Sequence, residues 1–510
     1  MHLFLYGPPG TGKTTIGQIL ANNLGLKFID LDRVIESNAG MSIPQIMERQ
    51  GESAFRDLEA TVLKSVSPLP NGEGQGVRDC VIALGGGALL RDENRQFAEN
   101  NGKVILLMAE LDTLLDRLKE DASERPLLAE DLETKLSSLL EQRREHYASF
   151  ALKLDVDSKT AEQNAHLAQI ILGRYHLSAM GEYDVLVDSV ERVTNSLYSN
   201  PIIVTDENVA NHHLKRINIE KSIIIPAGEE HKNLETVSHL WKSFLENGLD
   251  RKSTVIALGG GVVCDLTGFA ASTYMRGIDW LAIPTTLLAM VDASIGGKTG
   301  FDLPEGKNLV GSFHPPKLVL ADPSLLLTLS DRELRSGMAE VVKHGIIADP
   351  ELFAMCNRGM DWVKNNLETI VKRAMAVKIQ IIEQDPYEKG IRANLNLGHT
   401  VGHAVELVSG FKLSHGEATA IGMTVEAKYA ERIGIAGKGL AEKIADTLSA
   451  LGLPIPIPRE LPREEILRAM RADKKKSARS IRFPLPVKIG RVELIAARVE
   501  DFESVLDDGQ

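Results

Sequence analysis

Short apolar runs alternate with longer amphipathic segments over about the first 170 residues of the chain. Aliphatic runs bounded by polar residues predict strands at 3–6, 27–30, 81–84 and 104–108. Apolar positions at helical spacing predict helices at 14–24, 43–66, 111–119 and 132–146. Strand–helix alternation of this kind favours a parallel sheet covered by helices. The polar stretch at 67–76, rich in proline and glycine, predicts a surface loop.

A second α/β pattern begins near residue 183, and helical spacing replaces it after about residue 325. Its buried-strand runs lie at 201–206, 222–228, 254–261 and 280–286. The fold class is therefore predicted to be α/β, followed by a mostly helical module that continues to the end of the chain. The expected boundaries are 1–172 for the first domain, 173–182 for a linker, 183–325 for the second α/β domain and 326–510 for the helical domain.

Composition narrows the class of protein. The chain has 510 residues, of which 43% are hydrophobic and 25% charged, as in globular proteins with several domains. No apolar run approaches the roughly 18 residues that span a bilayer, and the N-terminus lacks the features of a secretory signal. Three cysteines without CxxC spacing favour a reducing cytoplasm. A formal net charge of −12 argues against nucleic-acid binding, so anionic substrates would need local clusters of lysine and arginine.

The segment GPPGTGKT at 7–14 matches the P-loop pattern, after a predicted strand and at the start of a predicted helix. Its glycines, including Gly10 and Gly12, allow backbone N–H groups to surround phosphates. Lys13 reaches the β- and γ-phosphates, Thr14 ligates Mg²⁺, and Thr15, the next residue, is expected to bind the nucleotide with them. The pattern predicts a nucleoside triphosphate site. A ring-forming ATPase motor is disfavoured, because the strand that would carry its metal-binding acids ends in VIALGGG.

Other motifs within residues 1–172 resemble those of shikimate kinase. They are Asp30-x-Asp32, the segment FRDLE at 55–59, the glycine triplet at 85–87 and the segment ERPLL at 124–128. The resemblance implies a P-loop kinase domain that uses ATP and Mg²⁺ to phosphorylate the 3-hydroxyl of shikimate. It implies that the substrate is held by Asp32, Arg56, Gly86 and Arg143, that Asp30 and Thr14 serve Mg²⁺, and that Lys13, Asp32 and Arg125 are catalytic.

Residues beyond 175 carry two chemical signals of unequal strength. GGGVVCD at 259–265 is a glycine-rich turn through which a backbone can approach a phosphate, but it lacks GxGxxG spacing. Alone, this turn is weak evidence for a dinucleotide site. His399 and His403 stand at i and i+4, His415 follows after a turn, and Glu340 offers a nearby acid. Such a set suits zinc with an open position, and spacing alone nominates both His399 and His403 as ligands. The alternative is that these are core or surface histidines without a metal.

The segment from about 180 to 500 resembles 3-dehydroquinate synthase. The motifs that carry the resemblance include GGGVVCD, IPTTLLAMVDASIGGKTG, GMAEVVKHG, LNLGHTVGHAVE and LSHGE. The resemblance implies a Rossmann-like NAD domain and a helical metal-binding domain. It also implies conversion of 3-deoxy-D-arabino-heptulosonate 7-phosphate, a seven-carbon keto-acid phosphate, to 3-dehydroquinate with loss of phosphate. Cys264 stands where this family usually has glycine.

The same resemblance assigns residue roles in this half. Zinc or another divalent metal would be held by Glu340, His399 and His415. NAD would contact Asp206, Asn208, Glu229, Lys232, Gly261, Asp265, Thr285, Thr286, Lys298, Lys307 and Thr328. Substrate would contact Arg276, Asp292, Asn308, Lys343, Lys378, Arg392 and Asn396, with a lysine from Lys474 or Lys475. Lys298, Lys343 and His403 would be catalytic. A homodimer through this half is also implied.

Three alternatives remain open at this point. The second half could be another sugar-phosphate cyclase, or, more distantly, a metal-dependent polyol dehydrogenase. The first half could be a non-catalytic nucleotide-binding module, although Lys13, Thr14, Asp32 and Arg125 are all present. Otherwise the chain is predicted to be a cytoplasmic bifunctional enzyme of the shikimate pathway, with small-molecule partners and neither nucleic acid nor membrane.

Overall fold

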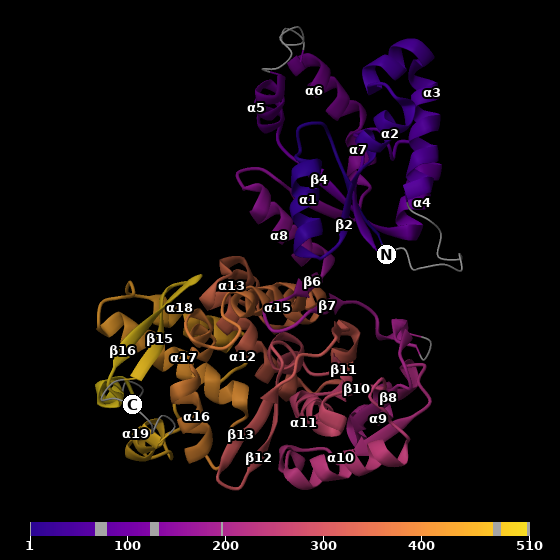
Figure 1. The fold of residues 1–510 in the computed structure, drawn as a ribbon. Helices are drawn as coiled ribbons and strands as arrows, with labels where there is room; N and C mark the ends of the chain where they lie inside the picture. The colour runs from indigo at the N-terminus through magenta and orange to yellow at the C-terminus, as the bar shows by residue number, and fades with distance from the viewer. Residues whose placement is uncertain (1, 67–78, 123–131, 195–196, 473–480, 507–510) are drawn as a thin grey trace. The chain divides into compact units, whose positions relative to one another are not determined.

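The structure is a computed structural model that describes residues 2–66, 79–122, 132–194, 197–472 and 481–506. The chain divides into two compact units, Met1–His176 and Leu177–Gln510 (Figure 1). The domain boundaries predicted from the sequence stay predictions. Among the described helices, none is both long and apolar enough to cross a lipid bilayer.

The first unit is built on a parallel sheet of five strands in the order β2-β3-β1-β4-β5. Its strands are β1 (His2–Tyr6), β2 (Lys27–Asp30), β3 (Cys80–Ala83), β4 (Gly102–Met108) and β5 (Leu152–Asp155). Its helices are α1 (Lys13–Asn23), α2 (Leu31–Ala39), α3 (Ile43–Val66), α4 (Asp92–Asn101), α5 (Leu111–Ala122), α6 (Leu132–Gln142), α7 (Arg144–Ala148) and α8 (Ala161–Leu172). The predicted helix-covered parallel sheet is confirmed.

Alternation along β1 separates the two cores of this unit. Phe4 and Tyr6 belong to a buried cluster with residues of α2, α3 and α4, whereas Leu3 and Leu5 belong to a cluster with residues of α1 and α8. Successive side chains of a strand point to opposite faces, so a strand that is apolar throughout is buried on both. Figure 1 shows these helices on opposite faces of the sheet. The P-loop therefore starts from the central strand of the sheet, which is buried on both faces.

The second unit begins with a sheet in the order β6-β7-β14-β11-β10-β8-β9, in which the pairs from β7 to β9 are parallel. Its strands are β7 (Tyr183–Val187), β8 (Ile202–Asp206), β9 (Ser222–Ile225), β10 (Thr254–Gly259), β11 (Asp279–Pro284) and β14 (Leu318–Ala321), while β6 (Arg174–Leu177) spans the boundary between the two units in the sequence. The helices along this sheet are α9 (Glu207–His213), α10 (Leu234–Glu246) and α11 (Gly261–Thr273). Every residue of β10 is buried, as expected for a central strand covered on both faces.

An antiparallel hairpin of β12 (Lys298–Leu303) and β13 (Gly306–Phe313) stands apart from this sheet. The sequence analysis did not predict it. Five of the eight residues of β13 are polar or glycine, and most of the strand is exposed, so it has no long apolar run to mark it.

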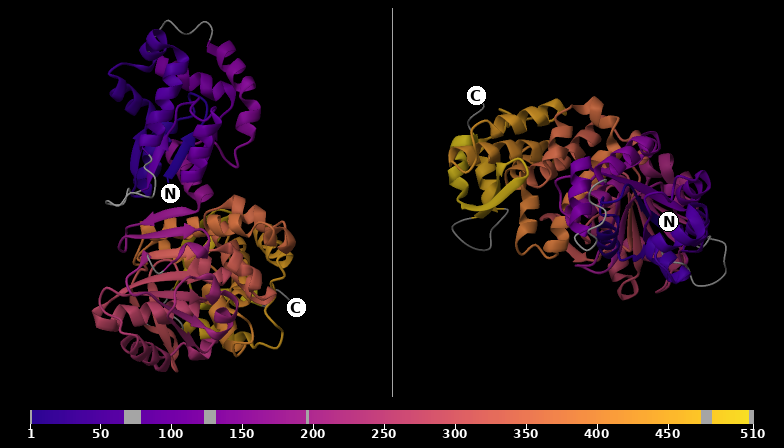
Figure 2. Two further views of the ribbon diagram at one scale, coloured as in Figure 1. Left: turned by 90° about the vertical axis from the view of Figure 1, so that its right-hand side faces the viewer. Right: turned by 90° about the horizontal axis from the view of Figure 1, so that it is seen from above.

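The remaining residues of the second unit form a helical region beside the sheet (Figure 2). Its helices are α12 (Asp331–Ile347), α13 (Pro350–Cys356), α14 (Met360–Lys364), α15 (Leu367–Gln384), α16 (His399–Val408), α17 (His415–Arg432), α18 (Leu440–Ala450), α19 (Arg463–Ala472) and α20 (Glu503–Leu506). The expectation of helices to the end of the chain is wrong at 481–497, where β15 (Ile481–Lys488) and β16 (Arg491–Ala497) form an antiparallel hairpin. Phe483 and Leu485 of β15 pack in the core with Phe502. Two prolines interrupt this run in the sequence, and a two-stranded hairpin tolerates them because each strand is an edge.

Candidate active sites

The P-loop of the first unit connects the end of β1 to the start of α1. Gly10 and Gly12 have φ angles of 81° and 79°, in the left-handed region that favours glycine. The Lys13 ammonium donates hydrogen bonds to the carbonyls of Gly7 and Pro8 at 2.9 and 2.8 Å. Burial lowers the pKa of Lys13 to about 8, against the opposing effect of nearby carboxylates. A phosphate chain would replace the lost solvation of this ammonium.

The residues nominated for Mg²⁺ lie next to each other. The Thr14 hydroxyl donates a hydrogen bond to Oδ2 of Asp30 at 2.8 Å, and Asp30 also caps α2 by accepting from the Arg33 N–H. Thr15 lies beside Thr14 in the first turn of α1 and is exposed. A hydroxyl paired with a carboxylate is a hard oxygen donor set, which fits magnesium.

The glycine triplet faces three residues nominated for shikimate. A Cβ atom on Gly85 would lie 2.8 Å from Oδ1 of Asp32, and one on Gly87 would lie 2.6 to 2.8 Å from the Arg56 guanidinium. Arg143 donates a hydrogen bond to the Gly86 carbonyl at 2.6 Å. The structure therefore brings an acid and two arginines to one loop. Arg125, with the whole of the segment ERPLL, lies outside the described residues.

Charge around Asp32 suits proton transfer. Oδ1 of Asp32 is buried and accepts no hydrogen bond from the described part of the chain. Burial and the charge of Asp30 raise the pKa of Asp32, against the opposing effect of Lys13. A carboxylate with a raised pKa is a better general base for a substrate hydroxyl.

Glu59 is a functional candidate to which the sequence analysis gave no role. It is buried and forms an ion pair with Arg56 at 2.8 Å, while the more exposed Glu52 lies 3.3 Å from the same guanidinium. Glu52 and Glu59 stand at i−4 and i+3 from Arg56 on one predicted helix, and this spacing could have predicted that they pair with the arginine.

In the second unit, three helices bring one acid and two histidines together. Glu340 lies within α12, His399 is the first residue of α16 and His415 is the first residue of α17. Their ligand atoms all lie within 4.8 Å of one another. Nε2 of His399 and Nε2 of His415 are 3.7 and 3.5 Å from Oε1 of Glu340.

His403 lies outside this group of three. Its ring centroid is 5.2 Å from that of His399 and 5.7 Å from that of His415, and the residue is exposed. Spacing alone paired His399 with His403, but the turn that precedes α17, capped by Ser414, returns His415 to the acid. The structure therefore groups the residues that the family resemblance nominated as ligands.

The donor set fits a divalent metal. Glu340 is fully buried, and neither of its oxygens accepts a hydrogen bond from the residues that the structure describes, although Lys343 forms an ion pair with it. Burial opposes ionisation of Glu340, but Lys343 and His415 outweigh it and hold its pKa well below the usual range. Burial lowers the pKa of His399 to about 3, so its imidazole is neutral, as a metal ligand must be.

Buried cations and acids surround this group. The Lys378 ammonium lies 2.6 Å from Oδ1 of Asp292, and both groups were nominated for substrate. Burial raises the pKa of Asp292, but Lys378 and Lys343 outweigh it and lower the pKa overall. Arg392 is 3% exposed and donates to the Pro386 carbonyl.

His344 is a buried neighbour that the sequence analysis missed. It is fully buried, and neither ring nitrogen has a hydrogen-bond partner among the described residues. Its ligand atom lies within 4.8 Å of those of Asp292 and Glu340. Burial lowers its pKa to about 3. Its position one helical turn after Glu340 was the available signal.

Several residues nominated for NAD, among them Asp206, Gly261 and Thr285, lie where strands of the parallel sheet end and helices begin. Gly261 is the first residue of α11, and the preceding Gly260 provides no side-chain cap, which leaves the helix N-terminus open to a phosphate. The Lys232 ammonium is 2.6 Å from both Oδ2 of Asp265 and Oδ1 of Asn308. A cationic group at a helix N-terminus suits a pyrophosphate.

The other nominated NAD residues are placed as follows. Asp206 caps α9, and Asn208 lies on that helix. Thr285 is buried just after β11, and the Thr286 hydroxyl accepts a hydrogen bond from the Ala289 N–H. The Thr328 hydroxyl is hydrogen-bonded to the His213 ring at 2.8 Å. The Cys264 thiol is buried and points toward the Gly259 carbonyl at 3.8 Å, so it lies within the protein interior. Arg276, nominated for substrate, has a left-handed φ of 71°.

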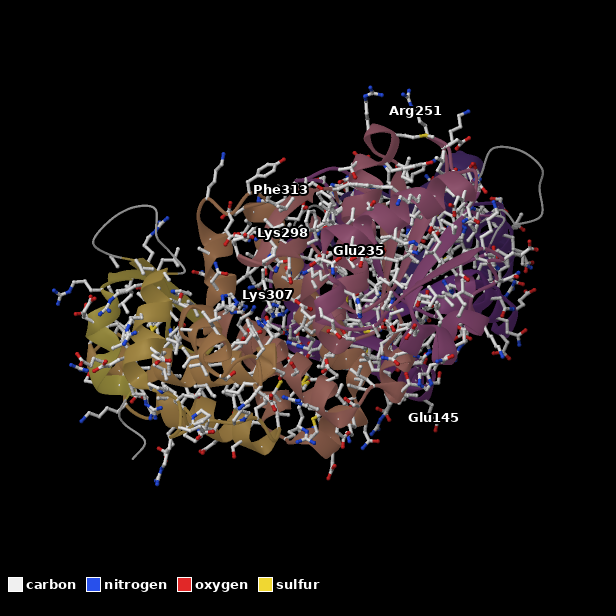
Figure 3. The ribbon with its side chains drawn as sticks, turned by 90° about the horizontal axis from the view of Figure 1, so that it is seen from below. Glu145, Glu235, Arg251, Lys298, Lys307 and Phe313 are labelled. Carbon is white, nitrogen blue, oxygen red and sulfur yellow. The ribbon has the colours of Figure 1, made fainter. Side chains whose placement is uncertain are left out.

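The hairpin supplies two more nominated cations, which Figure 3 labels. Lys298 pairs in register with Phe313, and its ammonium lies 2.6 Å from Glu388. Asn396 donates to the same carboxylate at 2.9 Å. Glu388 has a left-handed φ of 57° and was missed by the sequence analysis. Lys307, from β13, is described below.

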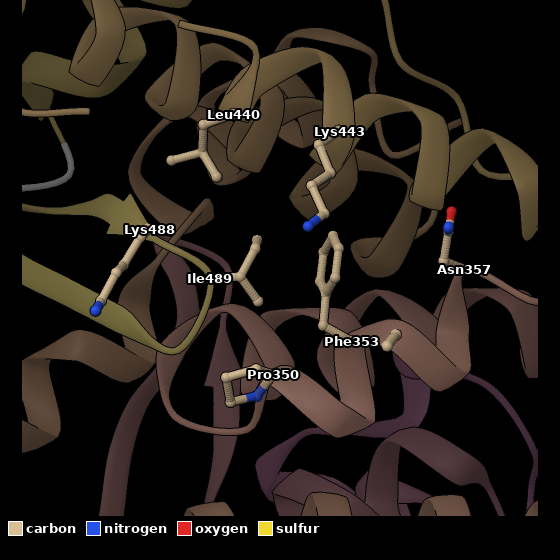
Figure 4. Close-up of a pocket in the computed structure, with 8 residues that line it drawn as sticks. Pro350, Phe353, Asn357, Leu440, Lys443, Lys488 and Ile489 are labelled. Atoms are coloured by element: carbon tan, nitrogen blue, oxygen red, sulfur yellow. The ribbon is translucent and has the colours of Figure 1, made fainter. Parts of the chain in front are cut away.

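A cavity of about 550 Å³ lies elsewhere in the second unit (Figure 4). Its lining is mostly apolar and comes from α13, α18 and the turn between β15 and β16. Lys443 lies over the Phe353 ring there, with 5.8 Å between the ammonium and the ring centroid. None of its lining residues belongs to either group described above.

A P-loop at the end of a parallel strand, and a carboxylate–histidine group beside a second parallel sheet, define an enzyme with two separate sites. Comparisons with known proteins agree. Family models match shikimate kinase at 9–172, the N-terminal part of 3-dehydroquinate synthase at 222–336 and its C-terminal part at 337–476. The chain belongs to the 3-dehydroquinate synthase family through its second unit, and its first unit carries a shikimate kinase domain. Both resemblances, and the predicted fold class, are confirmed.

Individual relatives are similar over the second unit. A 3-dehydroquinate synthase of Crocosphaera subtropica is 44% identical over 280 residues, 54% of this chain and 77% of the relative. One of Thermoanaerobacter sp. is 42% identical over 341 residues, 64% of this chain and 95% of the relative. A crystal structure of 2-deoxy-scyllo-inosose synthase with carbaglucose-6-phosphate, NAD⁺ and Co²⁺ has a TM-score of 0.60 at 26% identity, and covers 66% of this chain and 100% of that one.

Proposed function

We propose that the second unit converts 3-deoxy-D-arabino-heptulosonate 7-phosphate to 3-dehydroquinate and phosphate. The observation that carries this proposal is the grouping of Glu340, His399 and His415 with the buried cations Lys343 and Lys378. One site thus offers ligands for a metal and positive charge for a carboxylate and a phosphate. The acidic chain binds an anionic substrate through this local cluster.

The cofactors of this half are NAD and a divalent metal, with zinc proposed. When bound, they would supply a reversible hydride acceptor and a Lewis acid that polarises a substrate hydroxyl. Side chains of the protein bind the substrate and stabilise charge. Lys378 and Arg392 bind and orient the substrate anion in surroundings that exclude water, while the exposed His403 contacts substrate from the open side. Lys343 stabilises negative charge that develops near Glu340.

We propose that the first unit transfers the γ-phosphoryl group of ATP to the 3-hydroxyl of shikimate. Asp32, with its raised pKa, accepts the proton of the hydroxyl. Arg56 and Arg143 hold the substrate carboxylate as forked donors. Lys13 binds the phosphates, and Thr14 with Asp30 holds Mg²⁺. The domain boundaries, the homodimer and the cytoplasmic location stay predictions.

Phosphate release from the seven-carbon keto-acid phosphate tests the synthase. It is measured with catalytic NAD, before and after chelation of metal, while absorbance at the NADH band is followed. Metal-dependent release without accumulation of NADH is expected, because the hydride returns to the substrate-derived product. Accumulation of NADH would instead indicate a polyol dehydrogenase.

A related sugar-phosphate cyclase is the second candidate, favoured by the similarity to 2-deoxy-scyllo-inosose synthase. Against it, relatives with 42 to 44% identity are 3-dehydroquinate synthases. Incubation with sedoheptulose 7-phosphate and with glucose 6-phosphate separates the two. Preferred turnover of either sugar phosphate over the keto acid would overturn the assignment.

Two substitutions test the kinase in the full chain. Lys13→Ala and Asp32→Ala are each expected to abolish phosphorylation of shikimate and to leave phosphate release by the second unit unchanged. Retained phosphorylation in Asp32→Ala would contradict the role given to that carboxylate. Loss of both activities would indicate a folding defect or an unforeseen coupling between the units.

A further inference from the structure

The two histidines of the metal group differ in what holds their other ring nitrogen. Nδ1 of His399 lies 3.1 Å from the Leu397 carbonyl, which can only accept, so this nitrogen carries the proton. Nδ1 of His415 instead lies 3.5 Å from Oε2 of Glu406. In both rings Nε2 faces Glu340. A metal-binding histidine needs its second nitrogen fixed in this way, because that contact sets the tautomer and the direction of the ring.

Glu406 is itself held from a second direction. It lies in the last turn of α16 and is 7% exposed. Its Oε1 accepts a hydrogen bond from the Lys307 ammonium at 3.0 Å, and that ammonium also lies 3.7 Å from Glu229 and 4.8 Å from the centroid of the Phe411 ring. The two oxygens of Glu406 thus have different tasks, one toward Lys307 and one toward His415.

We propose that Glu406 is a positioning residue for the metal, which fixes the Nδ1-protonated form of His415 and aims Nε2 at the site of Glu340. The inference rests on the proposed metal-dependent function of the second unit. Glu406 does not belong to the group whose ligand atoms lie within 4.8 Å, because its carboxylate is on the far side of the imidazole. Through Lys307 and Glu229 it also connects the metal group to residues proposed for NAD.

Metal affinity tests this role without turnover. Glu406→Gln keeps the shape of the side chain and removes its charge. The matched control is Glu417→Gln, two residues after His415, where glutamine preserves the capping box of α17. Affinity for Zn²⁺ is measured on the full chain by competition with a chromogenic chelator at fixed pH. Glu406→Gln is expected to bind zinc about 10- to 100-fold more weakly, and Glu417→Gln within about threefold of the unsubstituted chain.

Co²⁺ absorption adds a readout that a general loss of stability would not move. A positioning role predicts that saturating Co²⁺ gives Glu406→Gln the same coordination number with a shifted band, whereas loss of a direct ligand would change the coordination number. If Glu406→Gln fails to fold by circular dichroism, Glu406→Asp keeps the charge at shorter reach and should show an intermediate loss of affinity. Unchanged zinc affinity in Glu406→Gln would overturn the inference. Failure of the unsubstituted chain to bind zinc would instead overturn the proposed function.

Discussion

Gly87→Ala tests whether the glycine triplet exists to leave room for Arg56. A Cβ atom at Gly87 would lie 2.6, 2.7 and 2.8 Å from Nη2, Nη1 and Cζ of Arg56. Because unstrained contacts of this kind need about 3.5 Å, the guanidinium must move by nearly 1 Å. Such a shift would remove the forked contact that we propose between Arg56 and the shikimate carboxylate, at a cost of about 1.5 to 3 kcal/mol. The expected result is a KM for shikimate raised about 10- to 100-fold.

Stability should change little in this variant. Gly87 has no left-handed φ, and the collision involves the end of a flexible side chain, so the free energy of unfolding should fall by about 1 kcal/mol or less. ADP formation is measured while the concentration of shikimate is varied at saturating ATP, and then while that of ATP is varied at saturating shikimate. The KM for ATP should stay unchanged, because the three atoms nearest to a Cβ at Gly87 all belong to Arg56 and none to the P-loop.

A double-mutant cycle can refute this reasoning. If Gly87→Ala acts through Arg56, it should have no further effect in an Arg56→Ala background. An equal rise in KM in both backgrounds would show that the methyl group acts elsewhere. Gly85→Ala is the contrasting variant: its Cβ would lie 2.8 Å from Oδ1 of Asp32, so kcat should fall more than KM rises.

Two further predictions concern buried charges and thiols. Lys378→Met leaves the Asp292 carboxylate without its ion-pair partner and should lower the free energy of unfolding by about 3 to 5 kcal/mol in denaturant titrations. Adding Asp292→Asn to this variant should recover most of the loss. Equal stability of the single and the double variant would contradict this prediction. Burial raises the pKa of Cys80 to about 11 and that of Cys356 to about 12, and it also raises the pKa of Cys264. All three thiols should therefore resist alkylation by iodoacetamide at pH 8 until the chain is denatured. Mass spectrometry of the alkylated chain measures this.

Most of the predicted strands contain a run of aliphatic residues, and β5 and β13, which contain none, were missed. β10 is buried along its whole length, and its run of aliphatic residues was predicted. β5 alternates leucine with a charged residue over only four positions, and β13 is mostly polar and exposed, so neither contains a run of aliphatic residues. Their strand conformation comes from pairing with a neighbour, β4 for the one and β12 for the other, which no local pattern encodes.

The metal group shows where residue spacing stops being informative. His399 and His403 are neighbours on a helix, and local geometry pairs them. The structure groups His399 with His415, because a turn between two helices brings His415 back to Glu340. From the sequence, only the resemblance to a family nominated that grouping, because residue spacing does not predict which residues a loop between two helices brings together.

The acids that the sequence analysis missed have one property in common. Glu59, Glu388 and Glu406 each lie within 3.0 Å of a cation that had been nominated for a ligand: Arg56, Lys298 and Lys307. Each of these acids fixes the direction of the cation with which it pairs. An incoming carboxylate or phosphate must then share the cation with its acid or displace it, which weakens binding but fixes geometry. In a chain of net charge −12, this local pairing would allow the proposed anionic substrates to bind at sites that also contain acids.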